Sequence, residues 1–74
     1  MNFSSKLRQA RIMKDLSISE MAELIEVSPS TYSGYEHGYR KPNLDKLVKI
    51  IEVLDIDANY LLKDKYTEFA YIIE

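Results

Sequence analysis

The 74-residue chain contains no cysteine and only two glycines and two prolines. Without cysteine it can form no disulfide, and it offers neither a thiolate for a zinc ion nor a thiol nucleophile. The low glycine and proline content excludes a collagen-like repeat and a Pro/Gly-rich disordered chain. A domain of this size without covalent staples must rely on well-packed helices or on a partner chain.

Long apolar runs are missing as well. No segment approaches the roughly 20 apolar residues that span a bilayer. The first residues, MNFSSKLRQAR, lack the apolar stretch of a signal peptide. We therefore expect a cytoplasmic protein that does not contact a membrane.

The residue types that form catalytic centres do not occur in any recognisable arrangement. There is no Ser/His/Asp set, no glycine-rich phosphate loop and no cluster of metal ligands in the sequence. The single histidine, His37, is better explained as a residue at a helix C-terminus than as a metal ligand. We expect no enzyme activity, no cofactor, no metal ion and no small-molecule substrate.

Positive charge is in slight deficit, with a formal net charge of −2. This average argues mildly against a nucleic-acid partner, because phosphate binding requires positive surface. The order of the charges changes that view: residues 1–14 carry +4, residues 15–38 carry −5, residues 39–49 carry +3 and residues 50–74 carry −4. Two basic blocks therefore flank an acidic centre, and a suitable fold could bring both blocks to DNA phosphates.

Apolar spacing and capping residues predict an all-α bundle of five short helices. The first helix is expected from Phe3 to about Lys14. The second starts at Ser17, because Ser17 and Glu20 have the spacing of a capping box, and it is expected to end near Glu26. The expected inward-facing residues are Phe3, Leu7 and Ala10 in the first helix, and Met21, Ala22, Leu24 and Ile25 in the second.

A third helix is expected from Pro29 to His37. Ser28 is a good capping residue, and proline suits the first helical position, where its missing N–H is no loss. Gly38 ends the helix, since glycine most easily takes the left-handed conformation that follows a helix.

Two further helices follow. Asn43 is expected to cap the fourth, and Asp57 a short fifth helix over Ala58–Leu62. The expected core stripe of the fourth helix consists of Leu44, Leu47, Val48, Ile51 and Leu54.

The last residues, 64–74, read DKYTEFAYIIE. The spacing of their apolar residues suits a helix, whereas the β-branched and aromatic content of FAYII suits a strand. In either form the segment is too apolar to lie in water alone, so we expect residues 1–63 to form a domain and 64–74 to be an apolar dimerisation tail. The expected dimerisation residues are Tyr60, Tyr66, Phe69, Tyr71 and Ile73.

The second and third helices, separated by Glu26-Val27-Ser28, form a helix-turn-helix. The spacing alone is weak evidence, because helix pairs with short turns are common. The ungapped stretch LSISEMAELIEVSPSTYSGYEHGYRKPNLDKLVKIIEVLDIDANYLL resembles the helix-turn-helix domain of phage Cro and repressor proteins and of bacterial XRE-type regulators. The resemblance covers roughly residues 3–62. Its matching features are Leu16-Ser17, Ala22-Glu23, Val27-Ser28, Ser33, Glu36, Gly38, Arg40, Pro42 and Leu44.

This resemblance implies a lambda-repressor-like DNA-binding domain in a homodimeric, sequence-specific transcriptional regulator, expected to be a repressor. The N-terminal half of the third helix would enter the major groove of double-stranded DNA. The implied base-contacting residues are Ser28, Pro29, Ser30, Thr31, Ser33 and Gly34. The expected phosphate-contacting residues, some of them at helix N-termini whose amides favour anions, are Arg11, Ser17, Ile18, Tyr39, Arg40, Lys41, Asn43 and Lys46.

The same resemblance implies structural roles. Arg11 and Glu36 resemble a pair that joins the first helix to the end of the third, and Tyr32 and Tyr35 take core positions. We expect Ala22 to be small because two helices cross closely there, and we expect Val27 to plug the turn into the core.

The sequence departs from the family pattern at three positions. Family members often have Gln, Arg or Lys at the positions of Pro29 and Gly34, and Gln at that of Ile18. The remaining short hydroxyl side chains discriminate little between bases. Specificity would then depend on water-mediated contacts, DNA shape or dimer spacing.

A protein-interaction module or antitoxin-like protein on the same fold therefore stays open as an alternative. Its binding surface would be the apolar tail or the acidic face formed by Glu20, Glu23 and Glu26. The acidic balance of the chain and the short side chains at the expected base-contacting positions of the third helix favour this alternative.

Overall fold

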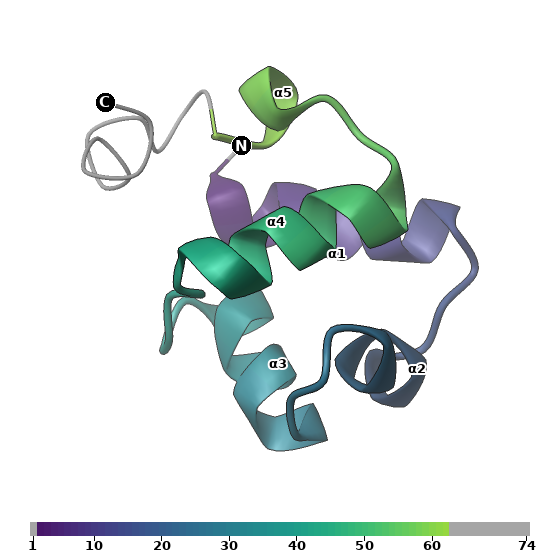
Figure 1. Cartoon of the computed structure of the whole chain (residues 1–74), viewed down its shortest axis with the longest axis vertical. Helices are drawn as coiled ribbons and strands as arrows, with labels where there is room; N and C mark the ends of the chain where they lie inside the picture. Colours follow the sequence, from purple (N-terminus) through teal and green to yellow (C-terminus); the bar gives the residue numbers. More distant parts are fainter. Residues whose placement is uncertain (1, 63–74) are drawn as a thin grey trace.

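The computed structural model describes residues 2–62, and in this range the chain forms five helices and no strand. They are α1 (Phe3–Met13), α2 (Ile18–Leu24), α3 (Pro29–His37), α4 (Leu44–Leu54) and α5 (Ala58–Leu62) (Figure 1). The predicted five-helix all-α bundle is confirmed. None of these helices is long and apolar enough to cross a membrane.

The expected dimerisation tail, residues 64–74, lies outside the described residues. Its residues Tyr66, Phe69, Tyr71 and Ile73, and the domain boundary at residue 63, stay predictions.

Every helix begins where the sequence pattern places its start, because a side-chain oxygen there accepts a hydrogen bond from a backbone N–H. In the capping box of α2, the Glu20 N–H donates to Ser17 Oγ (3.0 Å) and the Ser17 N–H donates to Glu20 Oε1 (2.8 Å). The accepting residues of the five helices are Asn2, Ser17, Ser28, Asn43 and Asp57.

Left-handed residues follow the first four helices, with φ of 61° at Asp15, 64° at Glu26, 79° at Gly38 and 51° at Asp55. Only Gly38 was expected. A left-handed conformation costs a non-glycine residue roughly 1–2 kcal/mol, and Asp tolerates it better than most. Acidic residues thus make three of the four sharp turns in a chain that has only two glycines.

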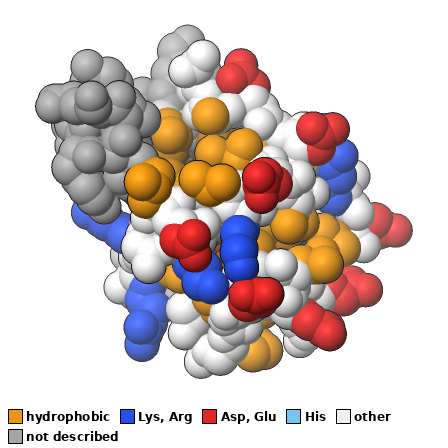
Figure 2. Space-filling view, viewed as in Figure 1, with side chains coloured by type: hydrophobic (Ala, Val, Ile, Leu, Met, Phe, Trp, Pro, Cys, Tyr) orange, Lys and Arg blue, Asp and Glu red, His pale blue; other side chains and the backbone are white. Residues whose placement is uncertain are grey.

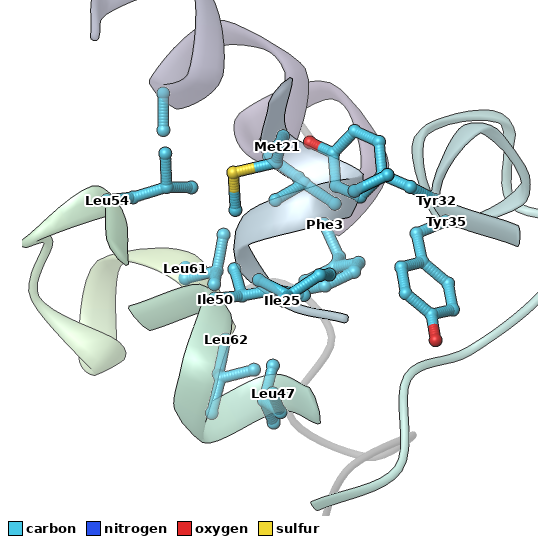
Figure 3. Packing of buried hydrophobic residues seen from close by; sticks show 13 residues of the cluster. Phe3, Met21, Ile25, Tyr32, Tyr35, Leu47, Ile50, Leu54, Leu61 and Leu62 are labelled. Atoms are coloured by element: carbon cyan, nitrogen blue, oxygen red, sulfur yellow. The ribbon is translucent and has the colours of Figure 1, made fainter. Parts of the chain in front are cut away.

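The core receives side chains from all five helices, and the larger ones converge in Figure 3. Tyr32 and Tyr35 are buried, as expected, with their rings in an edge-on arrangement 6.1 Å apart. In Figure 3 the Tyr32 ring lies beside Met21, while the Tyr35 hydroxyl points away from the cluster. The buried apolar residues are Phe3, Leu7, Ala10, Met21, Ala22, Ile25, Tyr32, Tyr35, Leu47, Ile50, Leu54, Leu61 and Leu62.

The predicted core faces of α2 and α4 were wrong at three positions. Leu24 and Leu44 are both 51% exposed and Val48 is 45% exposed. In α4, the buried face is made instead by Leu47, Ile50 and Leu54. Seven of the eleven α4 residues are apolar and cover one broad arc of the helix, so the pattern does not show which part of that arc faces the core. α2 also ends earlier than expected, at Leu24, with Ile25 as its cap.

The two faces of α4 lead to a prediction for a matched pair of leucines. Leu47→Ala should lower the free energy of unfolding by about 3 kcal/mol, because it leaves a cavity in the core. Leu44→Ala on the exposed face should cost less than about 1 kcal/mol. Urea unfolding followed by circular dichroism measures both. Equal losses would contradict the orientation of α4.

Candidate nucleic-acid interface

The helix-turn-helix consists of α2, α3 and the turn between them, which lie together at the bottom of Figure 1. Two residues fix the turn. The Val27 N–H donates to the Ala22 carbonyl (3.0 Å), and the Val27 side chain packs against the core. Ala22 is 1% exposed, as expected where two helices approach closely.

A network around Glu36 joins α3 to α1. Arg11 Nε lies 2.6 Å from Glu36 Oε2, and Arg11 Nη2 donates to Glu36 Oε1 (3.3 Å). The Tyr32 hydroxyl donates to Glu36 Oε2 (2.5 Å), and Arg11 Nη1 donates to the Leu16 carbonyl (2.7 Å). The structure thus brings together the two residues of the expected ion pair, and Tyr32 and the Leu16 carbonyl complete their contacts.

Burial strengthens this network, since the side chains of Arg11 and Glu36 are only 11% and 2% exposed. The hydrogen bond to Glu36 raises the pKa of Arg11. Burial, followed by the bond to Glu36, raises the pKa of the Tyr32 hydroxyl above its usual range. Both groups therefore keep their protons and remain donors to the carboxylate at neutral pH. A further tie from α1 is the Ser4 hydroxyl, which donates to the Tyr35 carbonyl (2.9 Å).

Two lysines of α4 hold the end of α2. Lys46 Nζ donates to the carbonyls of Ile25 (3.1 Å) and Glu26 (3.4 Å), and Lys49 Nζ lies 2.8 Å from Glu26 Oε1. The bond to Lys49 lowers the pKa of the Glu26 carboxyl. A cation at a helix C-terminus also interacts favourably with the helix dipole. Lys46, expected to contact phosphate, therefore contacts the protein's own backbone, a role that sequence spacing did not indicate.

The outward side of α3 carries short hydroxyl groups that contact one another. Ser28, Pro29 and Ser30 are exposed, and Thr31 is half-buried. The Ser28 hydroxyl donates to Thr31 Oγ1 (2.9 Å), and its oxygen also accepts from the Thr31 N–H (3.1 Å). Ser30 Oγ lies 3.3 Å from Ser28 Oγ. Each of these three hydroxyl groups therefore has a partner within the protein.

The second half of α3 is less accessible. Ser33 is half-buried, and its hydroxyl lies 3.2 Å from His37 Nδ1. Gly34 is buried, with the Arg40 side chain lying over it. The structure therefore does not bring Gly34 to the surface where a base contact was expected.

Positive side chains divide into two groups. The first group contacts protein acceptors and consists of Lys6, Arg11, Lys46 and Lys49. Lys6 Nζ donates to the Tyr60 carbonyl (2.9 Å) and lies 4.8 Å from the centre of the Tyr60 ring. Within residues 2–62, the exposed cations whose side chains have no protein acceptor are Arg8, Lys14 and Arg40. Figure 2 shows blue side chains at the lower left, on the side of the loop between α3 and α4.

The expected phosphate contacts in that loop are accessible. Tyr39 is 85% exposed, and its ring stacks on His37 with 5.9 Å between the ring centres. Arg40, Lys41 and Asn43 are exposed as well. The loop therefore presents an aromatic ring, two cations and an amide side chain next to α3.

The start of α2 is less suited to an anion than expected. The Ser17 N–H already donates to Glu20, whose carboxylate lies at the same helix end. That bond lowers the pKa of Glu20 and keeps it negatively charged at neutral pH. A phosphate would have to displace this carboxylate to reach the Ser17 amide. Ile18, half-buried, is the next residue with an amide at this end.

Metal binding finds no support in the part of the chain that the structure describes, because no three His, Cys, Asp or Glu side chains cluster there. The described residues also leave no buried side-chain polar atom without a hydrogen-bond partner. The polar groups available to a ligand are thus at the surface, and those of α3 and of the loop after it are among them.

Comparisons with known proteins agree with this geometry. A family model described as helix-turn-helix matches residues 7–61. The uncharacterized HTH-type transcriptional regulator YobD of Bacillus subtilis is 38% identical over 60 residues, which cover 81% of this chain and 54% of that protein. The cryptic phage CTXphi transcriptional repressor RstR of Vibrio cholerae is 35% identical over 65 residues, covering 88% of this chain and 59% of the repressor.

A solved structure has the same fold. It is described as a SinR protein/SinI protein complex and matches with a TM-score of 0.77 and 31% sequence identity, covering 89% of this chain and 65% of that one. The chain spans between half and two thirds of the length of these relatives.

The buried network leads to a prediction with a matched control. Glu36→Gln should lower the free energy of unfolding by about 3 kcal/mol, because it leaves Arg11 without its carboxylate partner. Glu26→Gln makes the same chemical change in an exposed pair and should change the free energy of unfolding far less, because solvent screens that pair. Urea unfolding measures both, and a loss at Glu36 as small as that at Glu26 would refute the role given to the network.

Proposed function

We propose that this chain, which belongs to the helix-turn-helix family of transcriptional regulators, binds double-stranded DNA with α3 in the major groove. The observation that carries the proposal is the Glu36 network. The network ties α3 to α1 through side chains on the inward side of α3. The hydroxyl-bearing side of α3 is thereby left at the surface. A rigid helix with one accessible polar side suits the major groove, which admits a helix.

Base contacts are assigned to the exposed start of α3 and to the half-buried Thr31 and Ser33 that follow it. The proposed residues are Ser28, Pro29, Ser30, Thr31 and Ser33, and Gly34 is left out because it is covered. Short hydroxyl groups can donate to or accept from several bases, and the Thr31 methyl group can contact a thymine methyl. Direct readout of sequence is therefore modest, and DNA shape supplies part of the specificity.

Phosphate contacts are assigned to the loop between α3 and α4. The proposed residues there are Tyr39, Arg40, Lys41 and Asn43. The exposed Arg8 of α1 and Lys14, directly after α1, are further cations. Arg11 and Lys46 are left out because their donors are engaged within the protein. Ser17 and Ile18 stay candidates only if a phosphate displaces Glu20. Because few cations are available to contact phosphates, we expect weak binding to non-specific DNA. A useful affinity is then expected only at a DNA site whose sequence matches.

We further propose that the regulator is a homodimeric repressor acting in the cytoplasm. A relative named as a phage transcriptional repressor supports the direction of the effect. A dimer would place two α3 helices about 34 Å apart, one turn of DNA. Its interface would include Tyr60 and the residues of the tail. Tyr60 borders an apolar groove of about 410 Å³ next to Met13, and both side chains are exposed.

DNA binding is tested by fluorescence anisotropy with DNA from upstream of the protein's own gene, against random DNA as competitor. Arg40→Ala should weaken binding to all sequences and make the slope of log affinity against log salt about 0.9 less steep, because one phosphate contact is lost. Ser30→Ala should change the preference among sequences. Lys49→Ala removes the same charge from a pair with Glu26 and should change the slope far less.

Two outcomes would count against DNA binding. One is that no fragment binds more tightly than random DNA, and the other is an affinity that does not change with salt. Either would favour the protein-interaction module, although two of its three proposed acidic residues, Glu20 and Glu26, already have partners within the chain.

The dimer is tested by light scattering on the full chain and on a chain ending at Lys65. The full chain should show twice the monomer mass of 8.6 kDa, and the shortened chain should show the monomer mass, because it lacks most of the apolar tail. An unchanged mass on shortening would remove the tail from the interface. In that case Tyr60→Ala tests the groove separately.

A further inference from the structure

Gly34 lies in the middle of α3, although glycine is less favourable than alanine in a helix interior. Its helical backbone does not require glycine, since Gly38 is the only glycine with positive φ. What distinguishes the position is its neighbour. A Cβ atom at residue 34 would lie 3.1 Å from both Cγ and Cδ of Arg40 and 3.4 Å from its Cβ. The aliphatic part of Arg40 therefore crosses α3 directly over Gly34.

The backbone holds Arg40 in the same place. The Gly34 carbonyl accepts hydrogen bonds from the N–H groups of Gly38, Tyr39 (2.9 Å) and Arg40 (3.2 Å). The chain after α3 thus folds back over the last turns of the helix. Both the backbone and the side-chain stem of Arg40 rest on Gly34.

The charged end of Arg40 is left accessible. Arg40 is exposed, and within residues 2–62 no carboxylate or carbonyl accepts a hydrogen bond from its guanidinium. Its charge is close enough to Tyr35 to oppose the rise in the Tyr35 pKa that burial causes. This places the guanidinium near the C-terminal half of α3, on a stem that is already ordered.

We propose that Gly34 is a positioning residue: by having no side chain, it seats the Arg40 stem across α3 and so aims the guanidinium at a DNA phosphate beside that helix. The inference rests on the proposed function. An arginine whose stem is already packed loses less conformational freedom on binding than a free one. Any larger residue at 34 would move the stem by a few tenths of an ångström or displace it altogether.

The test is a double-mutant cycle of Gly34→Ala and Arg40→Ala, with DNA affinity measured over a range of salt concentrations. Gly34→Ala alone should weaken binding three- to tenfold and make the salt slope less steep, as Arg40→Ala does. In the Arg40→Ala background, Gly34→Ala should change the affinity less than twofold, because no stem is left to displace. The melting temperature of Gly34→Ala should stay the same or rise, since alanine favours the helix.

An equal loss in both backgrounds would overturn the proposal, because Gly34 would then act on DNA without Arg40. No loss in the wild-type background would overturn it as well.

A measurement without DNA separates this proposal from the proposed function. The heteronuclear NOE of Arg40 Nε–Hε should be high in the wild type and lower in Gly34→Ala. A low value in the wild type would refute the ordered stem even if DNA binds. A high value together with no DNA binding would refute the proposed function, and with it the phosphate as the group that Arg40 contacts.

Discussion

The buried carboxylate of Glu36 is the group on which the orientation of α3 depends. Its side chain is 2% exposed, and removing a carboxylate from water costs several kcal/mol unless charged and neutral donors replace the solvent. Arg11 and Tyr32 supply those donors from α1 and from α3 itself. The Arg11 bonds and the bond from the Ser4 hydroxyl to the Tyr35 carbonyl tie α3 to α1. The burial of Tyr32 and Tyr35 sets the rotation of α3 about its own axis. The hydroxyl-bearing side of α3 can then be only the outer one.

The chain holds several short helices together without disulfides, and some of its basic residues serve this purpose. Long cationic side chains can bury their stems and reach backbone carbonyls at helix ends. Lys6 does this at α5 and Lys46 at the end of α2, while Lys49 pairs with Glu26 in the turn. Several of the eight cations in the two basic blocks therefore contact the protein itself, and those with backbone acceptors, such as Lys6 and Lys46, brace the fold. The charge pattern that suggested a phosphate-binding surface is in part the signature of internal bracing.

Local features could be predicted from the sequence, whereas contacts that only the fold creates could not. Helix starts were predictable because a cap acts within three or four residues, as at Ser17 and Asn43. The buried face of α4 was not, because its apolar residues cover an arc that is wider than the buried face. The left-handed acids, such as Asp15 and Glu26, were not predicted. Their conformation accompanies backbone hydrogen bonds that close the helix ends, such as the bond from the Val27 N–H to the Ala22 carbonyl. The Arg11 and Glu36 pair came from the family resemblance, because 25 residues separate the partners and no local rule joins them. The bracing by Lys46 depends on a distance that only the fold sets.

The surface formed by α3 and the loop after it carries mostly short polar side chains, and several of its side chains already have contacts within the protein. The Ser28, Ser30 and Thr31 hydroxyls contact one another, and the Arg40 stem lies on Gly34. A surface of this kind gives up little conformational freedom when it binds, so each contact contributes more of its interaction energy to affinity. The same rigidity limits how far the side chains can adapt to different bases. If the proposed function holds, such an interface favours DNA whose groove already has the matching shape. A helix with short polar groups can then distinguish one DNA site from another by groove shape.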